Sequence, residues 1–341
     1  MTQHEQTNVP GRITPRGCGR TGVAAYISDT IAMMQAGTHL WRGSHYTESG
    51  IANWKKILGI WKRFETETGR CGIDFDSFSP EVLNSFFFWL DMTGCRESSK
   101  SQYSTLLKAV LNSALESGCS NNTIHLTRKF RKCRTQMDDI MKVYLAENEI
   151  EAIRTLALPP RGTLDKVRDV FLMGCYTGQR FSDYSTLGMT DIVTVMAEGK
   201  NHKVFCKRQK KTGNVILIPI LFCWIEEMLA KWGGSVPDVS IACLNKRIKD
   251  ISRLAGINTP VLLQDGGAPR TVPKWRMISS HTARRSFITN MYLGGVLSPE
   301  QLRSISGHRS EAAFRRYLCF SSEEMVRSIF SAWDTRSHYL R

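Results

Sequence analysis

Residues 306–318 read SGHRSEAAFRRYL and form the last of four short polar segments in the second half of the chain. The other three are TGQRFSD at 177–183, KKTG at 210–213 and HTARRSF at 281–287. Each segment alone has an ordinary explanation, because a His-x-x-Arg pair usually lies on a helix surface and a Lys-Lys-Thr-Gly turn is usually solvated. Their joint occurrence, in this order and at these distances, indicates one shared site.

The charge of the chain indicates the kind of partner. Among 341 residues there are 46 Lys and Arg against 31 Asp and Glu, which gives a net charge of +15. The length suggests two domains, and the positive surplus is spread over both halves, so we expect both to contact a polyanion. Nucleic acid is favoured over a membrane surface. A generically basic soluble protein is the ordinary alternative.

Cysteine spacing and hydropathy bear on location. None of the ten cysteines forms a Cys-x-x-Cys pair, so a zinc ribbon or a redox motif is not supported. Cys175 and Cys223 sit in apolar runs, where we expect buried free thiols. No apolar stretch is long enough to cross a membrane, and no signal-peptide core is present near residue 1. We therefore expect a reduced, cytoplasmic protein.

The first half of the chain reads as an arm followed by helices. Residues 1–22 are polar, rich in Gly and Pro, and predict a flexible basic arm. Apolar periodicity and capping signals then predict four helices. Trp54, Trp61 and Trp89 are expected to be core aromatics. The helices are predicted at about 23–36, 47–68, 80–93 and 98–117, and the basic residues of the arm are Arg12, Arg16 and Arg20.

A basic run, RKFRKCR at 128–134, separates this half from the next and predicts a linker that lies along phosphates; a solvated helix face is the ordinary alternative. Beyond it we predict a mostly helical region with one small antiparallel sheet. The tip of its hairpin is residues 208–213. The helices are predicted at about 147–157 and 164–175, the strands at 203–207 and 214–218, and further helices continue to about 334.

The four polar segments resemble the tyrosine recombinases of the phage integrase family, especially the integrases of bacterial conjugative and mobilisable elements. Six residues match the family series Arg, Lys, His-x-x-Arg, Gly-His and Tyr, and none is substituted. The resemblance covers about residues 23–335, although the first half matches only in pattern and length. The six residues are Arg180, Lys211, His281, Arg284, His308 and Tyr317.

The chemistry of the resemblance assigns each residue a role. Two guanidiniums, Arg180 and Arg284, would bind the non-bridging oxygens of a phosphodiester. The Tyr317 hydroxyl would be the nucleophile of a covalent 3′-phosphotyrosine. Lys211 would protonate the leaving 5′-hydroxyl. His281 and His308 would contact the phosphate, and which of them helps remove the tyrosine proton stays open.

Two assignments have competitors within the same segments. Lys210 competes with Lys211 as the general acid, and the resemblance favours Lys211 because the family's pattern places the acid directly before Thr-Gly. Asp183 is either a carboxylate that orients Arg180 or an ordinary surface residue. The segments contain no clustered carboxylates of the kind that hold two magnesium ions, so we expect no metal and no cofactor.

The resemblance implies a two-domain architecture. A helical, SAM-like core-binding domain would span 23–127, a basic linker 128–145, and an integrase-type catalytic domain 146–341. The candidate DNA-binding residues lie in the linker, on the hairpin and beside Arg284. They are Arg128, Lys129, Arg131, Lys132, Arg134, Lys207, Arg208, Lys210 and Arg285.

The partners expected from the resemblance are double-stranded DNA with specific core sites and further copies of the chain. Four protomers would bind two sites, with accessory DNA-bending proteins as further partners, in the nucleoid. An amphipathic helix after Tyr317, which includes Phe330 and Trp333, is predicted to dock on a neighbouring protomer; packing within its own chain is the alternative. Only about 22 residues precede the first predicted helix, which favours recombination at core sites alone.

The predicted function is therefore site-specific DNA recombination by integration, excision or inversion. A type IB-like DNA topoisomerase, which would relax supercoils without exchanging partners, is one alternative. A DNA-binding protein of the same fold without the chemistry is another. An RNA-binding protein would need stacking surfaces for single strands, and no such motif is present.

Overall fold

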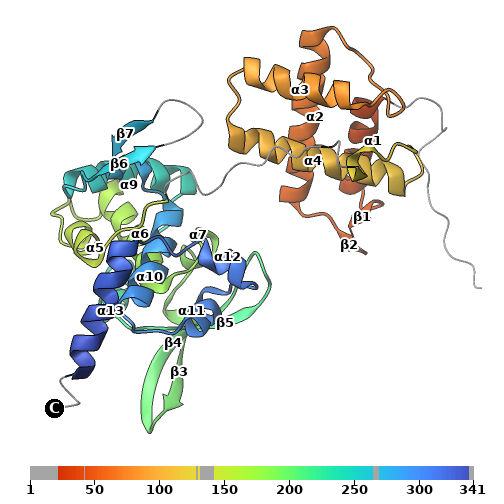
Figure 1. Cartoon of the computed structure of the whole chain (residues 1–341). Helices are drawn as coiled ribbons and strands as arrows, with labels where there is room; N and C mark the ends of the chain where they lie inside the picture. Colours follow the sequence, from red (N-terminus) through yellow and green to blue (C-terminus); the bar gives the residue numbers. More distant parts are fainter. Residues whose placement is uncertain (1–21, 42, 128–129, 131–141, 264–268, 338–341) are drawn as a thin grey trace, which may run out of the picture. The chain divides into compact units, whose positions relative to one another are not determined.

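In the computed structural model, the described residues form two compact units (Figure 1). The first unit lies within 22–130 and the second within 142–337. The structure describes residues 22–41, 43–127, 130, 142–263 and 269–337. Residues 1–21 of the predicted arm lie outside the described residues, as does the predicted linker at 128–145 except for residues 130 and 142–145.

The first unit is built on four helices, with a two-stranded hairpin, β1–β2, and a short 3-10 turn at Ile124–Leu126. The sequence sets the ends of the helices. Thr47 and Ser79 accept hydrogen bonds from the first turns that follow them, and Gly69 ends a helix in the left-handed conformation, with φ 69°. The helices are α1 (Val23–Gln35), α2 (Glu48–Thr68), α3 (Pro80–Met92) and α4 (Glu97–Glu116), and the strands are β1 (Leu40–Trp41) and β2 (Ser44–His45).

An aromatic core joins α2 and α3. Trp61 is fully buried and packs against Phe64, Phe78 and Phe86, with ring centroids 5.2–5.9 Å apart. Trp54 and Trp89 are also buried. The three tryptophans expected in the core are therefore confirmed there, where they contribute buried area to this unit.

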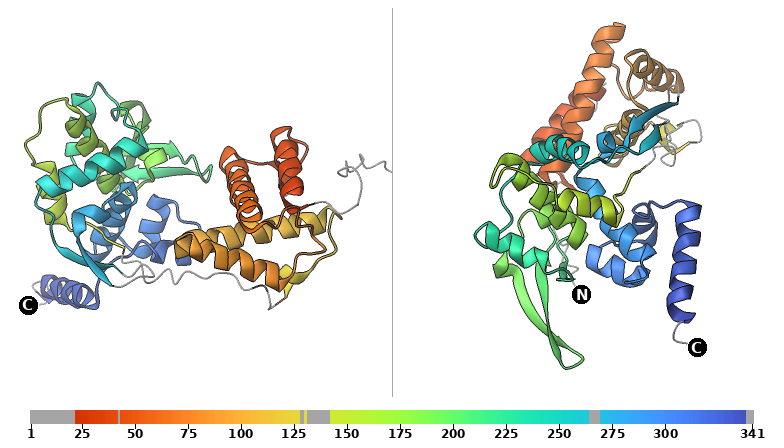
Figure 2. Two further views of the ribbon diagram at one scale, coloured as in Figure 1. Left: turned by 90° about the horizontal axis from the view of Figure 1, so that it is seen from above. Right: turned by 90° about the vertical axis from the view of Figure 1, so that its left-hand side faces the viewer.

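The second unit packs most of its helices around α6 and α10, which contact each other. Two views show α13 along the outside of this unit (Figures 1 and 2). The helices are α5 (Glu147–Arg154), α6 (Thr163–Thr177), α7 (Phe181–Tyr184), α8 (Trp224–Lys231), α9 (Ile241–Leu254), α10 (Ser280–Leu293), α11 (Pro299–Ser306), α12 (Glu311–Arg315) and α13 (Ser322–Ser337). Short 3-10 turns lie at Met189–Asp191 and Lys274–Met277.

The sheet of this unit is antiparallel, in the order β3–β4–β5, with β3 at Ile192–Ala197, β4 at Lys200–Arg208 and β5 at Val215–Pro219. Phe205, Ile216 and Ile218 are on the face that packs into the core. A separate hairpin pairs β6 (Pro260–Leu263) with β7 (Arg270–Pro273). The predicted fold class, mainly helical with a small antiparallel sheet, is confirmed.

Two details differ from the sequence predictions. Strand β3 was not anticipated; it is exposed along most of its length, so its residues IVTVMA lack the alternation of a half-buried strand. Cys223 was expected to be buried but is exposed at the start of α8, whereas Cys175 inside α6 is buried as expected. An apolar neighbourhood in sequence did not place Cys223 in the core, because that turn faces solvent.

Among the described residues, no helix combines the length and apolar character needed to cross a bilayer.

Candidate active site

The centre of the site is Arg284 on α10, whose side chain has no exposed surface. Its guanidinium donates to the carbonyl oxygens of Gly178 at 3.0 Å and Ser306 at 2.9 Å, and to Nε2 of His308 at 2.9 Å. It also lies over the Tyr317 ring, 5.1 Å from the centroid. Its Nε is buried without a hydrogen-bond partner among the described residues. Arg284 therefore contacts two of the other predicted residues, His308 and Tyr317, and its Nε–H is still available as a hydrogen-bond donor.

Arg180 lies where the chain leaves α6. Gly178 ends that helix with φ 66°, and a Cβ there would lie 2.3 Å from the Phe287 ring, so both the conformation and the close approach require glycine. The guanidinium of Arg180 is 4.0 Å from the Asp183 carboxylate, and its buried Nη1 has no hydrogen-bond partner in the described part of the chain. Asp183 is buried, which favours its predicted orienting role over a surface one.

His308 and Tyr317 are placed by the short segment between α11 and α13. Gly307 ends α11 with φ 68°, and His308 follows it. The His308 and Tyr317 rings are 4.7 Å apart at their centroids. Nδ1 of His308 lies 2.8 Å from Oγ of Ser306, which donates to the Leu302 carbonyl. Nη2 of Arg284 lies 2.9 Å from Nε2 and 3.2 Å from Nδ1, so the neutral ring that fits these contacts best has its proton on Nδ1 and accepts from Arg284 at Nε2.

The cluster formed by Arg180, Arg284, His281 and His308 disfavours protonation of its histidines. Burial, followed by the guanidiniums of Arg284 and Arg180, lowers the pKa of His308 to about 3. Burial and then Arg180 lower the pKa of Arg284 to about 10, so Arg284 stays charged at neutral pH. The pKa of His281 is also lowered, by desolvation and then by nearby cations that include Arg285 and Lys211. The cluster thus holds neutral histidines beside permanent cations, an arrangement that favours binding of an anion.

The two remaining predicted residues are Lys211, on a further element, and His281, on the same helix as Arg284. Lys211 is exposed on the tip between β4 and β5, and His281 is exposed on the first turn of α10. The backbone N–H of Lys210 donates to Asp183 at 2.8 Å, and Arg309 donates to the Thr212 carbonyl at 2.9 Å. The hairpin tip is therefore attached to the segments that carry Arg180 and His308.

The candidate DNA-binding residues differ in their surroundings. Arg128, Lys129, Arg131, Lys132 and Arg134 lie outside the described residues. Lys207 pairs with Asp191 at 3.1 Å, and Arg285 donates to the Val143 carbonyl at 2.9 Å, so both have partners within the unit. Arg208 and Lys210 are exposed. Contact with DNA stays a prediction for all nine.

Sequence reasoning missed two buried amides at this site, Gln179 and Gln209. The Gln209 side-chain amide donates to the side-chain oxygen of Gln179 at 3.1 Å and to the Ser306 carbonyl at 3.2 Å. Both residues are fully buried. Each stands next to a predicted functional segment, but a glutamine beside charged residues gives no signal of burial.

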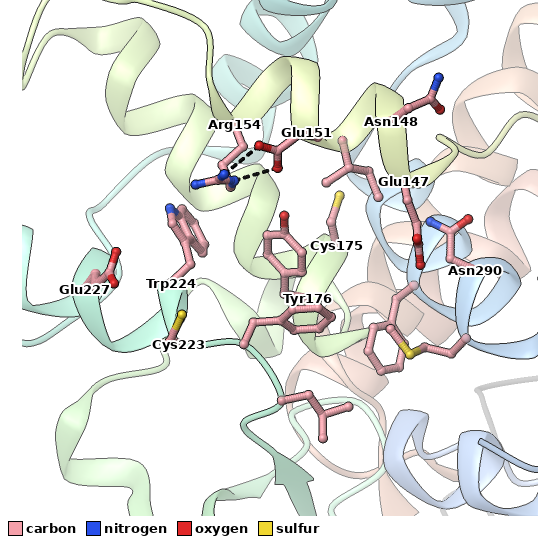
Figure 3. Close-up of a pocket in the computed structure, with 15 residues that line it drawn as sticks. Glu147, Asn148, Glu151, Arg154, Cys175, Tyr176, Cys223, Trp224, Glu227 and Asn290 are labelled. Atoms are coloured by element: carbon pink, nitrogen blue, oxygen red, sulfur yellow. Dashed lines mark hydrogen bonds and ion pairs between the residues drawn. The ribbon is translucent and has the colours of Figure 1, made fainter. Parts of the chain in front are cut away.

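A separate cavity of about 720 Å³ lies beside α5, α6 and α8 (Figure 3). The rings of Tyr176, Phe222 and Trp224 form one part of its wall. Its one cationic side chain, Arg154, pairs with Glu151, and two further glutamates line it. This lining does not suit a phosphate. Within the described residues, no group of three or more His, Cys, Asp or Glu side chains is arranged to hold a metal ion.

One part of this chain matches a family model, and its fold is similar to that of several solved structures. The model of the phage integrase SAM-like domain matches residues 40–132. No curated protein sequence matches the chain. A lambda integrase dimer bound to a core site matches with a TM-score of 0.60 and 15% identity, over 86% of this chain and 94% of that one. A lambda integrase tetramer bound to a Holliday junction matches with a TM-score of 0.60 and 16% identity, over 92% and 81%.

A third similar structure is an integrase of the Tn1549 transposon in complex with circular intermediate DNA, with a TM-score of 0.58 and 14% identity over 91% of this chain and 99% of that one. The domain match and these likenesses define the class: the chain contains a phage integrase SAM-like domain and has the fold of the tyrosine recombinases. The resemblance drawn from the sequence motifs is confirmed at this level.

The neutral state of His308 predicts a pH-dependent stability. The native ring stays neutral down to a pKa of about 3, whereas the unfolded chain takes up a proton below about 6.5, so this residue favours unfolding increasingly as the pH falls between those values. Thermal unfolding of the wild type and of His308→Gln at about pH 7.5 and about pH 5 should show a smaller acid-induced drop for the variant. An equal drop in both proteins would contradict the neutral assignment.

Proposed function

We propose that this protein is a site-specific DNA recombinase that cleaves and rejoins DNA through a 3′-phosphotyrosine on Tyr317. The observation that carries the proposal is the convergence on Arg284, which contacts His308 and the Tyr317 ring while its Nε has no partner among the described residues. Arg180 also has a buried N–H with no hydrogen-bond partner among the described residues, and its guanidinium raises the positive electrostatic potential at Arg284. Two such groups suit the bidentate binding of one phosphate.

The chemical step follows from these positions. The guanidiniums bind the non-bridging oxygens and offset the charge that grows on them. The Tyr317 oxygen then attacks phosphorus, a Tyr–O–P bond forms, and the bond from phosphorus to the 5′-oxygen breaks. Lys211 gives its proton to that oxygen, and the tyrosine proton passes to a histidine. Attack by a 5′-hydroxyl of the partner strand reverses the sequence and rejoins the DNA.

His308 has two states in this scheme. Without DNA its Nε2 accepts a hydrogen bond from Arg284, so it has no proton to offer there. A phosphate anion beside the two guanidiniums would raise the pKa of His308 by offsetting their charge. The ring could then take up a proton, from Tyr317 or from solvent, and donate to a phosphate oxygen. His281 remains the other candidate for this proton transfer. We propose that the two guanidiniums supply the positive charge at the phosphate without a metal.

The proposed partners are duplex DNA with specific core sites and three further copies of the chain. Support comes from two similar structures, a lambda integrase dimer bound to a core site and a lambda integrase tetramer bound to a Holliday junction. We also propose the domain boundaries predicted above, 23–127 and 146–341, and a cytoplasmic, nucleoid-associated location. Binding to DNA by this many basic residues should weaken steeply with salt.

Helix α13 is the proposed contact between copies. Its first two turns are held within their own chain, where Tyr144 donates to Glu324 and Ser328 donates to the Leu293 carbonyl. The apolar side chains further along are nevertheless exposed, with Phe330 and Trp333 each at 63%. Such a stripe on one helix indicates a protein contact. Contacts within the same chain therefore hold the start of α13 in place, but they leave the apolar side chains of its later turns exposed to solvent.

Two alternatives use the same fold. A type IB-like topoisomerase would relax supercoiled plasmid without producing recombinants from a two-site substrate. A DNA-binding protein without the chemistry would form no covalent adduct. Recombinant products together with an adduct distinguish the proposed function from both.

Removing the proposed nucleophile provides the first test. On a nicked suicide substrate carrying the core site, the wild type should accumulate a covalent protein–DNA adduct, and Tyr317→Phe should form none while binding DNA with unchanged affinity, because only the hydroxyl is lost. Tyr292→Phe, which changes another half-buried tyrosine of this unit, is the matched control and should form the adduct normally. An adduct from Tyr317→Phe would show that the nucleophile is misassigned.

The role of α13 can be tested without deleting it. The double substitution Phe330→Ala and Trp333→Ala removes exposed apolar surface, so the free energy of unfolding should change by less than about 0.5 kcal/mol per site. Assembly on two DNA sites, measured by analytical ultracentrifugation, should be lost or strongly weakened. Val296→Ala, also at an exposed position, is the control. Undiminished tetramer assembly by the double variant would contradict the docking role.

A further inference from the structure

The hairpin tip that carries Lys211 has one side chain that points inward. Lys210 and Lys211 are exposed, whereas Gln209 has no exposed surface. The tip closes on itself, since Gln209 N–H donates to the Asn214 carbonyl at 2.8 Å and Gly213 N–H donates to the Gln209 carbonyl at 2.9 Å. These backbone bonds shape the tip but do not connect it to the guanidiniums.

The Gln209 side chain adds a buried connection to the two described above, from Lys210 to Asp183 and from Arg309 to Thr212. Its oxygen accepts from the Thr212 hydroxyl at 2.7 Å, next in sequence to Lys211. Its nitrogen donates to the side-chain oxygen of Gln179, the residue before Arg180, at 3.1 Å. Gln179 in turn donates to the carbonyls of Thr177 at 3.0 Å and Ile305 at 2.8 Å. The two amides thus link the tip, the Arg180 turn and the end of α11.

The backbone carbonyl of Ser306 links the hairpin tip to Arg284. The Ser306 carbonyl accepts from Arg284 at 2.9 Å and also from Gln209 at 3.2 Å. Both lone pairs of that oxygen are thereby used, one by the proposed phosphate-binding group and one by the hairpin that carries the proposed acid. A shift of Gln209 would therefore move Lys211 relative to Arg284.

Gly307 permits this approach. A Cβ at position 307 would lie 2.3 Å from Oε1 and 2.4 Å from Nε2 of Gln209, closer than packed atoms can come. The glycine also has φ 68°. The Gly-His pair of the sequence thus serves the amide link as well as the turn before His308.

We infer that Gln209, supported by Gln179, is a positioning residue that holds Lys211 at the distance from Arg284 required for protonation of the leaving oxygen. The inference rests on the proposed function, in which Lys211 is the general acid. Proton transfer depends steeply on the separation of donor and acceptor, so loss of this link should slow the step that needs the acid and leave phosphate binding in place.

A substrate with sulfur in place of the 5′-bridging oxygen isolates that step. A thiol has a pKa of about 8.5, whereas a hydroxyl such as that of water has a pKa of about 16. A 5′-thiolate can therefore leave without a proton donor, whereas a 5′-hydroxyl needs one. We would measure single-turnover cleavage of a suicide substrate with oxygen or sulfur at this atom, for Gln209→Met, Lys211→Ala and Arg284→Ala. Gln35→Met, at an exposed glutamine of α1, is the control for the substitution itself and should cleave both at the wild-type rate.

Gln209→Met should cleave the oxygen substrate about 10-fold to 100-fold more slowly than the wild type and the sulfur substrate within about 3-fold of it. Lys211→Ala should show the same pattern with a larger loss on oxygen, and Arg284→Ala should be slow on both. Equal slowing of Gln209→Met on both substrates, or no slowing, would overturn the inference. Failure of sulfur to restore Lys211→Ala would instead overturn the acid assignment, and the inference with it.

A second variant covers the case in which Gln209→Met does not fold. Thr212→Val removes only the hydroxyl that donates to Gln209, at a half-buried position, and keeps the side-chain shape. It should show the same selective loss on the oxygen substrate, by about 3-fold to 10-fold. Unchanged cleavage of both substrates by Thr212→Val would contradict a link that runs through this hydroxyl.

Discussion

The buried guanidinium of Arg284 imposes the main constraint on the second unit. Burying a charge is costly unless other groups compensate for it. Here two backbone carbonyls and the Nε2 of His308 accept its hydrogen bonds, but neither a carbonyl nor a neutral imidazole carries a full negative charge. Arg180 adds a second cation, and the lowered pKa of Arg284 reflects that unfavourable environment. A phosphate would offset both charges, so the same environment that lowers the pKa of Arg284 would favour the proposed binding of an anion.

Close approach of backbone segments makes this arrangement possible. Gly178 lets the end of α6 lie against Phe287 of α10, and Gly307 lets the end of α11 lie against Gln209 of the hairpin. Each glycine also has a positive φ that ends its helix. Two segments far apart in sequence can therefore present the carbonyls of Gly178 and Ser306 to Arg284, and the second carbonyl also accepts from Gln209. The motifs TGQR and SGH combine a glycine that shapes the backbone with a polar residue that lies in the site.

Much of this was predictable from the sequence. The helices of the first unit follow from apolar spacing and from caps such as Thr47 and Ser79, which are local signals. The six candidate residues follow from motifs, and the structure brings Arg284, His308 and Tyr317 into contact. The amide link was not predictable, because Gln209 meets Ser306 across 97 residues of sequence and glutamine is usually exposed. Cys223 shows the same limit, since an apolar run does not reveal which side of a turn faces solvent.

A structure of Tyr317→Phe bound to a core-site duplex would test the central claim most directly. The quantities to measure are the distances from the phosphorus at the cleavage step to the guanidinium carbons of Arg180 and Arg284 and to the phenyl ring that replaces the tyrosine. The account predicts that both guanidiniums bind non-bridging oxygens of that one phosphate, with the ring edge directed at its phosphorus. Guanidiniums bound to phosphates of different nucleotides, or a ring directed away from the cleaved step, would contradict it.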